Sequence, residues 1–489
     1  MSVQFQLYID GRFEPGAATF GSLNPATGEV WAQMPEARTG EVNRAVEAAS
    51  RALSDPAWAG ITASSRGKLL YKLADLVEKA APRLAEIETH DTGKIIRETS
   101  SQIAYVAEYY RYYAGIADKI QGSHIPVDKP DMQVWLERQP VGVVAAIVPW
   151  NSQLFLSAVK VGPALAAGCT VVLKASEEAP GPLLEFARLV HEAGFPPGVV
   201  NVITGFGAEC GAVLSGHPKV DKVAFTGGPE TAKHIVANTS NNLARVSLEL
   251  GGKSPFIVFA DADIQSAVNA QVAAIFAASG QSCVAGSRLL IEASIKDTFL
   301  ALLVERVSRI RVGLPNDMAT EYGPLCTEKQ LRHIESVVAR SVQQGARALA
   351  GAEKLDRPGY YYAPTILDCS GVANADSITT ELFGPVLSVD TFASEQEAIE
   401  KANSTAYGLA AGIFTTNLTR AHRVSKRVRS GIVWINTYRA VSPLVPFGGF
   451  GRSGHGREGG FSAALEYTTT KSVWLRTSDD PISDPFVMR

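Results

Sequence analysis

The spacing of apolar residues divides the chain into a helical first part and a longer alternating part. Between 41 and 119, apolar residues recur three or four positions apart, as in EVNRAVEAASRAL, which predicts amphipathic helices. Beyond residue 140 the apolar runs are short, β-rich and almost continuous, which is typical of buried strands. These runs lie at 142–149, 170–175, 199–205 and 222–227, and helix-length segments lie between them at 154–168 and 179–194. Buried strands that alternate with helices predict right-handed crossovers and a parallel sheet covered on both faces.

The alternation begins again after ELGGKSP, so we predict a second α/β domain from about residue 253. Its predicted strands are 254–260, 287–293, 364–369 and 385–392, and its predicted helices are 263–278, 295–310, 327–344 and 394–402. The run 471–477 predicts a strand that stands apart from both series. Such a strand must pair within its own domain or with a neighbouring subunit.

Composition favours a soluble globular protein. Apolar residues make up 46% and charged residues 19%, and 46 basic against 49 acidic residues give a net charge of −3, so a nucleic-acid partner is not expected. The longest apolar run, 141–150, is about half of the ~20 residues that a membrane span needs, and the first residues do not resemble a signal peptide. Five scattered cysteines without a C-x-x-C pair indicate neither a disulfide framework nor a zinc site. We expect a cytoplasmic protein with reduced thiols, no metal site and no membrane partner.

Two glycine-rich segments are candidates for the loop that binds the phosphates of a dinucleotide. GFGRSG (449–454) has the G-x-G-x-x-G spacing but lacks a preceding strand and a following β-α-β unit, so we reject it. AFTGGPETAKHIV (224–236) fits better, because a strand leads into Gly227 and Gly228 and a helix begins at Pro229. A helix N-terminus offers unpaired N–H groups to a phosphate. From this segment alone, a simple turn explains the glycines equally well.

Two further features have a functional and a structural explanation. Lys174 and Glu177 follow a predicted parallel strand, at the sheet edge where ligands bind, and could hold the ribose hydroxyls of a nucleotide or form a solvated pair. Cys283 lies among small residues in SGQSCVAG (279–286), which suits both an accessible nucleophile and a buried structural thiol.

Six motifs in order carry a resemblance that changes this balance. They are VPWN (148–151), FTGG (225–228), ELGGKSP (249–255), GQSCVAGSR (280–288), ELFGPV (381–386) and PFGGFGRSGHGRE (446–458). Together they resemble the NAD(P)-dependent aldehyde dehydrogenase superfamily, and other stretches extend the similarity over essentially all 489 residues. The similarity implies an α/β fold with a Rossmann-type cofactor domain, a catalytic α/β domain and a small β bridging flap. The implied ranges are 1–122 and 143–252 for the cofactor domain, 253–433 for the catalytic domain, 434–463 for a return segment with the Gly-rich loop, and 123–142 with 464–489 for an oligomerisation flap that makes homodimers or homotetramers.

The resemblance also implies a reaction, the oxidation of an aldehyde to its carboxylic acid. A thiolate adds to the carbonyl, hydride transfer leaves a thioester, and water hydrolyses it. Cys283 matches the nucleophile, and the Asn151 side-chain amide, with the Cys283 backbone N–H, matches the donors for the oxyanion. Glu249 matches the base that activates water. Lys160 and Glu458 match positions on the proton path, where a structural salt bridge would look the same.

The implied cofactor is NAD. Glu381 matches the residue that holds the nicotinamide ribose, and Phe383 the one that packs beside the nicotinamide. Gly228 and Ala232 replace a usual serine and a third glycine, which removes one hydroxyl from a site built mainly of backbone. Because Glu177 would repel a 2′-phosphate, we predict NAD rather than NADP. The full predicted set is Val148, Pro149, Trp150, Lys174, Glu177, Gly207, Gly211, Phe225, Thr226, Gly227, Gly228, Thr231, Leu250, Gly251, Gln330, Glu381 and Phe383.

The predicted substrate tunnel is wider than acetaldehyde needs. Ser152 and Val159 stand where acetaldehyde-type members often have bulky aromatic residues, and Ala277 is also small. Arg439 maps to the tunnel mouth, where it either anchors a distal carboxylate, as in a semialdehyde, or is a surface arginine. The predicted pocket comprises Tyr105, Ser152, Phe155, Val159, Ala277, Ser282, Val284, Arg439, Val441 and Phe447.

Two other classes are weighed against a dehydrogenase. A cysteine hydrolase or acyltransferase would need a histidine partner, and none of the eight histidines lies in such an arrangement. An inactive structural relative is disfavoured because Cys283, Glu249, Asn151 and Glu381 are all present. Glu249 also favours hydrolysis to a free acid over transfer to coenzyme A.

Overall fold

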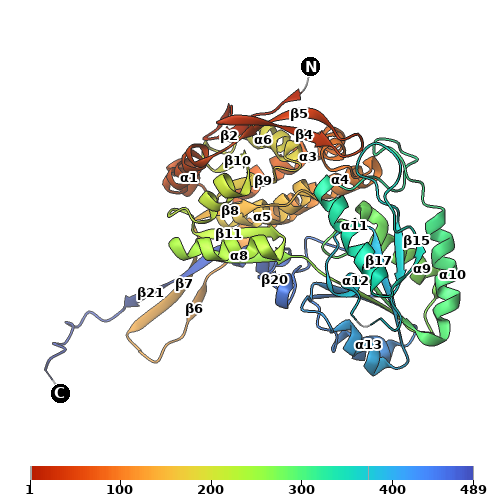
Figure 1. Cartoon of the computed structure of the whole chain (residues 1–489). Helices are drawn as coiled ribbons and strands as arrows, with labels where there is room; N and C mark the ends of the chain where they lie inside the picture. Colours follow the sequence, from red (N-terminus) through yellow and green to blue (C-terminus); the bar gives the residue numbers. More distant parts are fainter. Residues whose placement is uncertain (1–2, 373, 488–489) are drawn as a thin grey trace.

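The computed structural model describes residues 3–372 and 374–487, which form two α/β bodies and a projecting flap (Figure 1). The larger sheet has the strand order β20-β12-β11-β8-β9-β10-β2-β3, and its central strands run parallel. Their bounds are β12 (Arg245–Leu250), β11 (Lys222–Gly227), β8 (Val143–Ile147), β9 (Thr170–Ala175) and β10 (Val200–Thr204). The antiparallel edges are β20 (Gly454–His455), β2 (Leu7–Ile9) and β3 (Arg12–Glu14). The strands predicted at 170–175 and 222–227 are confirmed to the residue, and those at 142–149 and 199–205 are one or two residues shorter at their ends.

Helices cover both faces of this sheet because alternate strand residues face opposite sides. Val144, Val171 and Leu173 pack with one group of helices, and Ala145 and Val172 pack with the other. The first group is α3 (Ala63–Thr92), α4 (Ile96–Ile116), α5 (Gln153–Ala167) and α6 (Gly181–Ala193). The second group is α1 (Thr39–Ser54), α7 (Ala212–Ser215) and α8 (Pro229–Asn238), and the short α2 (Pro56–Ala59) follows α1. The helical prediction for 41–119 is therefore confirmed.

The second body contains a seven-stranded sheet in the order β15-β16-β17-β14-β13-β18-β19. The predicted strands correspond to β13 (Pro255–Val258), β14 (Arg288–Glu292), β16 (Thr365–Asp368) and β17 (Val386–Phe392). The predicted helices correspond to α9 (Ile264–Phe276), α10 (Lys296–Ser308), α11 (Glu328–Gln343) and α13 (Glu395–Ala402). The sequence analysis did not predict β15 (Arg347–Ala350), β18 (Ala410–Phe414), β19 (Ile432–Ile435), α12 (Asp376–Thr379) and α14 (Leu418–Ser425).

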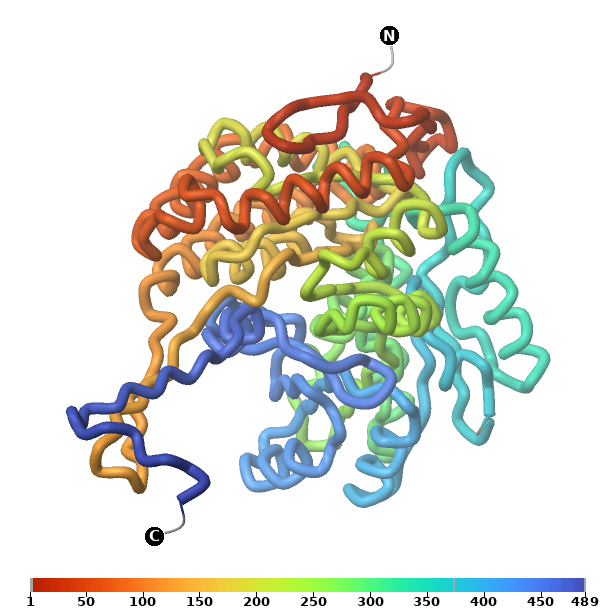
Figure 2. Tube along the Cα trace, turned by 90° about the vertical axis from the view of Figure 1, so that its left-hand side faces the viewer, coloured from red at the N-terminus to blue at the C-terminus, as the bar shows by residue number. Residues whose placement is uncertain are grey.

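A three-stranded antiparallel sheet extends away from both bodies (Figures 1 and 2). It consists of β21 (Thr468–Arg476), β7 (Met132–Pro140) and β6 (Ser123–Ile125), in that order. The strand predicted at 471–477 is part of β21 and pairs with β7 of the same chain, from Thr468 opposite Pro140 to Arg476 opposite Met132. Trp474 and Leu475 of β21 are exposed.

A second small sheet lies near the N-terminus and was not predicted. It contains β1 (Val3–Gln4), β5 (Glu29–Glu36) and β4 (Ala18–Asn24). The domain boundaries at 123, 143, 253, 434 and 464 remain a proposal. No helix in the described ranges is long and apolar enough to cross a membrane.

Candidate active site

A cavity of about 1470 Å³ lies between the two α/β bodies and collects most of the predicted site residues. Of the predicted catalytic residues, Lys160 alone does not line it. Every predicted substrate-pocket residue lines it, from Tyr105 to Phe447. The predicted cofactor residues that line it are Pro149, Trp150, Thr226, Gly227, Gly228, Leu250, Gly251, Gln330, Glu381 and Phe383. Those that lie outside its lining are Val148, Lys174, Glu177, Gly207, Gly211, Phe225 and Thr231.

Cys283 follows a sharply bent segment after helix α9. Ala278 and Ser279 both have φ 52°, and Gly280 has φ 73°, so the chain leaves the helical conformation at once. The bend is held from outside, since the Glu98 carboxylate accepts from the Ala278 N–H at 2.9 Å and Ser279 Oγ donates to the Gly323 carbonyl at 2.8 Å. A left-handed backbone at non-glycine residues is costly and persists only where its surroundings enforce it. This segment therefore presents Cys283 in a fixed position on the cavity wall.

Burial and the neighbouring carboxyl groups favour the protonated form of the Cys283 thiol. Burial is the main cause, and the carboxyl groups of Glu249 and Glu381 act in the same direction while the Arg439 guanidinium opposes them; together they raise the pKa of Cys283 to about 12. Because a thiolate is the reactive form, the site must remove this proton before the sulfur can attack a carbonyl.

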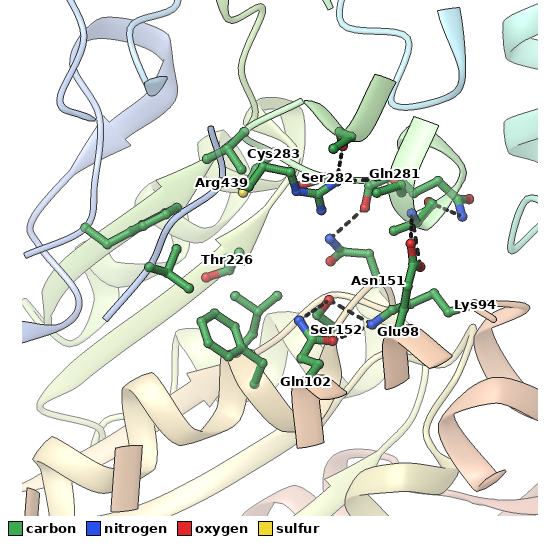
Figure 3. Close-up of a pocket in the computed structure, with 18 of the residues that line it drawn as sticks. Lys94, Glu98, Gln102, Asn151, Ser152, Thr226, Gln281, Ser282, Cys283 and Arg439 are labelled. Atoms are coloured by element: carbon green, nitrogen blue, oxygen red, sulfur yellow. Dashed lines mark hydrogen bonds between the residues drawn. The ribbon is translucent and has the colours of Figure 1, made fainter. Parts of the chain in front are cut away.

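The Asn151 side chain lies beside the nucleophile segment (Figure 3). Its Nδ2 donates to the Gln281 carbonyl at 3.0 Å, and this bond uses one of its two N–H groups. Its Oδ1 is buried and has no hydrogen-bond partner among the described residues. The amide is thus fixed near Cys283 with one N–H to spare.

Glu249 is a buried carboxyl group whose environment differs from that of an ordinary surface glutamate. It lies on β12 opposite Thr226 of β11 and Gly454 of β20. Its residue is 4% exposed, and neither carboxyl oxygen has a hydrogen-bond partner among the described residues. A Cβ at Gly448 would lie 2.6 Å from Oε1 of Glu249. The absence of a side chain at Gly448 therefore provides the space for this carboxyl group. Burial raises the pKa of Glu249 well above its usual range, Glu458 raises it further, and Lys160 opposes both.

Lys160 and Glu458 form an ion pair behind this carboxyl. Lys160 is fully buried, and its Nζ also donates to Thr226 Oγ1 at 2.6 Å. Glu458 reaches the cavity surface, whereas Lys160 lies behind it. The structure therefore has a salt bridge between Lys160 and Glu458. A role of this pair on a proton path stays a prediction.

The loop between β11 and α8 has the geometry that the sequence predicted. The strand ends at Gly227 and the helix begins at Pro229, with Gly228 in an extended conformation and no side-chain cap. A Cβ at Gly228 would meet nothing within 4 Å, so the helix N-terminus faces open space. Lys174, near the end of β9, and Glu177, just beyond it, form an ion pair of 2.9 Å, and β8 separates β9 from β11 in the sheet. The N-terminus of α8 could therefore bind a phosphate, and the Lys174–Glu177 pair could bind a polar group of the same ligand.

The segment 449–454, which the sequence analysis rejected as a phosphate loop, also lies outside any β-α-β unit. The segment forms a short turn and then β20, which leads into α15 (Gly460–Leu465) without a β-α-β unit.

Glu381, from the second body, contacts Gly251 and Gly252, and Phe383 follows it two residues along the chain. Glu381 Oε1 accepts from the Gly252 N–H at 3.0 Å, and a Cβ at Gly251 would overlap its carboxyl group. Burial raises the pKa of Glu381 to about 7. Phe383 has a left-handed backbone with φ 49°, and its ring packs edge-on against Trp150 with centroids 5.4 Å apart. Both side chains line the cavity.

Comparison with known proteins agrees with this geometry. The aldehyde dehydrogenase family model matches residues 13–473. The chain belongs to the aldehyde dehydrogenase family. It is 78% identical over 486 residues to a protein of Acinetobacter baylyi named (Z)-2-((N-methylformamido)methylene)-5-hydroxybutyrolactone dehydrogenase, covering 99% of this chain and 100% of the relative. It is 42% identical over 473 residues to aldehyde dehydrogenase family 2 member B4 of Arabidopsis thaliana, covering 96% and 87% of the two chains. An NAD+ complex of a Bacillus cereus aldehyde dehydrogenase superimposes with a TM-score of 0.95 at 40% identity, covering 97% of each chain.

The sequence analysis missed a polar group in the cavity of this aldehyde dehydrogenase. Lys94 Nζ donates to Glu88 Oε1 at 2.8 Å, to Gln102 Oε1 at 2.5 Å and to Ser152 Oγ at 3.2 Å. Ser152 was predicted only as a small residue that widens the tunnel. No motif marked Lys94 or Gln102. Lys94, in the turn between α3 and α4, and Gln102, on α4, meet Ser152 only through tertiary packing against the start of α5.

Arg439 lines the cavity of this aldehyde dehydrogenase and is half-buried. Its backbone is left-handed with φ 61°. Its Nη1 donates to the carbonyl oxygens of Ala273 and Ala277 at 3.1 and 3.3 Å, at the C-terminal end of α9, where a positive charge is favourable. Arg439 is therefore part of the cavity wall, and its contact with a substrate carboxylate stays a prediction.

Proposed function

We propose that this enzyme oxidises an aldehyde to the free carboxylic acid with NAD, through a thioester at Cys283 that a Glu249-activated water hydrolyses. The observation that carries the proposal is the buried carboxyl of Glu249, which has no hydrogen-bond partner in the described part of the chain and lines the same cavity as the Cys283 thiol. Leaving a carboxyl unpaired in the interior is unfavourable, and such groups occur mainly where they act as bases.

The residues present fit NAD. The open N-terminus of α8 at Gly228 would hold the phosphates, and the Lys174–Glu177 pair would hold the adenosine ribose. Glu381 and Phe383 would hold the nicotinamide end, where NAD, when bound, accepts a hydride from the substrate carbon. The negative charge of Glu177 supports NAD over NADP. The similar Bacillus cereus enzyme was solved as an NAD+ complex.

Protein groups would stabilise the oxyanion of the adduct and activate the water that hydrolyses the thioester. The spare N–H of Asn151 and the backbone N–H of Cys283 would stabilise the oxygen of the tetrahedral adduct, a contribution of ~10²–10³ in rate per donor. The Glu249 carboxylate, whose raised pKa makes it a stronger base than an exposed glutamate, would take the proton of the attacking water. The Lys160–Glu458 ion pair, with Thr226, which accepts a hydrogen bond from Lys160, would relay that proton.

The proposed substrate is a functionalised semialdehyde. A 5-hydroxybutyrolactone, as in the name of the Acinetobacter baylyi relative, is the ring form of a 4-oxo carboxylic acid, so its open form has an aldehyde and a carboxylate. A cavity of about 1470 Å³ with small walls at Ser152, Val159 and Ala277 leaves room for such a molecule.

The test is NADH formation from NAD with an aldehyde panel that includes succinic semialdehyde, the hydroxybutyrolactone of the relative, and butanal. Wild-type protein should reduce NAD with at least one of them, and Cys283→Ala should lower kcat/KM by at least about 10³-fold while NAD still binds. Cys369→Ala, which removes a buried thiol that is not part of the cavity lining, is the matched control and should remain active. Turnover by Cys283→Ala close to that of the control would reject the proposal.

A cysteine hydrolase or acyltransferase receives no support from the site. Among the described residues that line the cavity, none is a histidine, so Cys283 has no imidazole base there. Hydrolysis of an ester substrate without NAD, together with no NADH from any aldehyde, would favour that class instead.

A further inference from the structure

Ser152 occupies the position that normally caps a helix, but its side chain does not cap α5. Serine at this position usually accepts from an N–H of the first helical turn. Here Ser152 has φ −162° and ψ 63°, and no side-chain cap hydrogen bond forms. Its Oγ instead accepts from Lys94 Nζ at 3.2 Å and from Gln102 Nε2 at 3.4 Å. The hydroxyl is thus turned away from its own helix toward two side chains of the cavity wall.

These two bonds determine what the hydroxyl can still do. A serine oxygen has two lone pairs and one hydrogen. Both lone pairs of Ser152 are used by Lys94 and Gln102, so only the hydrogen remains. No acceptor for that hydrogen is present among the described residues, and Ser152 is half-buried in the cavity lining. The free hydrogen is available to an acceptor inside the cavity.

Lys94 orients this donor without serving as one itself. Its three ammonium hydrogens already have acceptors in Glu88, Gln102 and Ser152, and the Lys94–Glu88 pair is buried, with side chains 4% and 1% exposed. A hydroxyl that accepts from a cation is polarised and becomes a stronger donor. Gln102 Nε2 keeps one further N–H beside it.

We propose that Ser152, oriented and polarised by Lys94 and Gln102, donates a hydrogen bond to a carboxylate oxygen of the open-chain aldehyde substrate. Figure 3 places Lys94, Gln102 and Ser152 together on one wall, next to Asn151, and Cys283 with Arg439 across the space. The substrate oxygen is thereby held on the side of Asn151 while the aldehyde carbon meets Cys283. This inference rests on the proposed function, and it makes Ser152 the polar group by which the enzyme selects aldehydes that carry a carboxylate.

Arg439 is the competing anchor for the same oxygen. It carries a full charge and lines the same cavity, but its Nη1 is already bonded to the end of α9. The experiment must therefore separate the two donors.

We compare kcat/KM for succinic semialdehyde and for butanal, which share a four-carbon chain and differ in the carboxylate. Ser152→Ala should lower the ratio of the two values by roughly tenfold to a hundredfold, mainly through KM, because it removes a hydrogen bond to a charged group. Ser152→Thr keeps the hydroxyl and should restore most of the ratio. Ser100→Ala, on the exposed side of α4 outside the cavity lining, is the matched control and should keep it.

An unchanged ratio in Ser152→Ala, or a threonine variant no better than the alanine variant, would overturn the proposal. A ratio that falls in Arg439→Met but not in Ser152→Ala would assign the oxygen to Arg439 and overturn it as well. Failure of the proposed function would give a different result, because the wild-type protein would then form no NADH from either aldehyde.

Discussion

The protonation of Glu249 determines the pH at which thioester hydrolysis can run. Burial raises its pKa well above the usual range, so the carboxyl is protonated where an exposed glutamate is already ionised. The base form appears only as the pH rises through this raised pKa. We therefore expect kcat to rise with pH above the range of an ordinary glutamate when hydrolysis limits turnover. The pH profile of kcat measures this, and a profile that is flat from acid to neutral pH would contradict it.

Glu177 makes a separate prediction about the cofactor. Its carboxylate pairs with Lys174 at 2.9 Å and would stand against a 2′-phosphate. We expect kcat/KM to be at least about tenfold higher with NAD than with NADP, a difference of ~1.4 kcal/mol. Glu177→Gln should narrow the difference by improving the use of NADP. Equal or better use of NADP by the wild-type protein would refute the role of Glu177.

Some single residues could be predicted from sequence and others could not. Cys283, Glu249 and Asn151 lie in contiguous motifs, and the structure brings all three to one cavity. Lys94 and Gln102 lie in no motif, because their hydrogen bonds to Ser152 form only when the α3–α4 turn and α4 pack against the start of α5. A local pattern carries no information on such contacts between distant segments.

At the scale of elements, the same distinction applies to strands. The buried runs 170–175 and 222–227 were predicted to the residue because both faces of a parallel strand are apolar. RVSLEL, which forms β12, was not predicted as a strand, since its first residue is an exposed arginine and its fifth is Glu249. The strand that carries the proposed base was thus obscured by the charge that its function requires.

The glycine-rich loop at 446–458 supports Glu249, and this makes a prediction at Gly448. Its φ of +151° disfavours other residues, and a Cβ would lie 2.6 Å from Glu249 Oε1. Gly448→Ala should displace the carboxyl and lower the steady-state rate at least about tenfold, while a first rapid phase of NADH formation persists. Gly40→Ala, where a Cβ would approach only Arg44, is the control. Loss of the rapid phase together with the steady state would place the effect of Gly448 before hydrolysis.

At the scale of the whole molecule, the flap at 123–142 and 464–489 is the proposed site of assembly. One edge of β21 pairs with β7, and no other strand of the described chain pairs with its second edge. Trp474 and Leu475 on this strand are 56% and 48% exposed, and an exposed apolar strand edge is a common site of association.

We therefore expect the protein to be a homodimer or homotetramer in solution. Light scattering coupled to size-exclusion chromatography should give that mass, and Trp474→Glu with Leu475→Glu should reduce it. Leu418→Glu, which changes a leucine 83% exposed on α14, is the matched control and should leave the mass unchanged. A monomeric wild-type protein would refute the role of the flap.

The most direct test of the central claim uses Glu249→Gln in the full-length protein, mixed with NAD and succinic semialdehyde and quenched in acid. Without the base, the thioester should accumulate: NADH should form in a rapid phase close to stoichiometric with enzyme and then almost stop. Mass spectrometry should find the acyl group of the substrate on the peptide that contains Cys283. An unmodified Cys283 after that rapid phase, or an acyl group on another residue, would contradict the account.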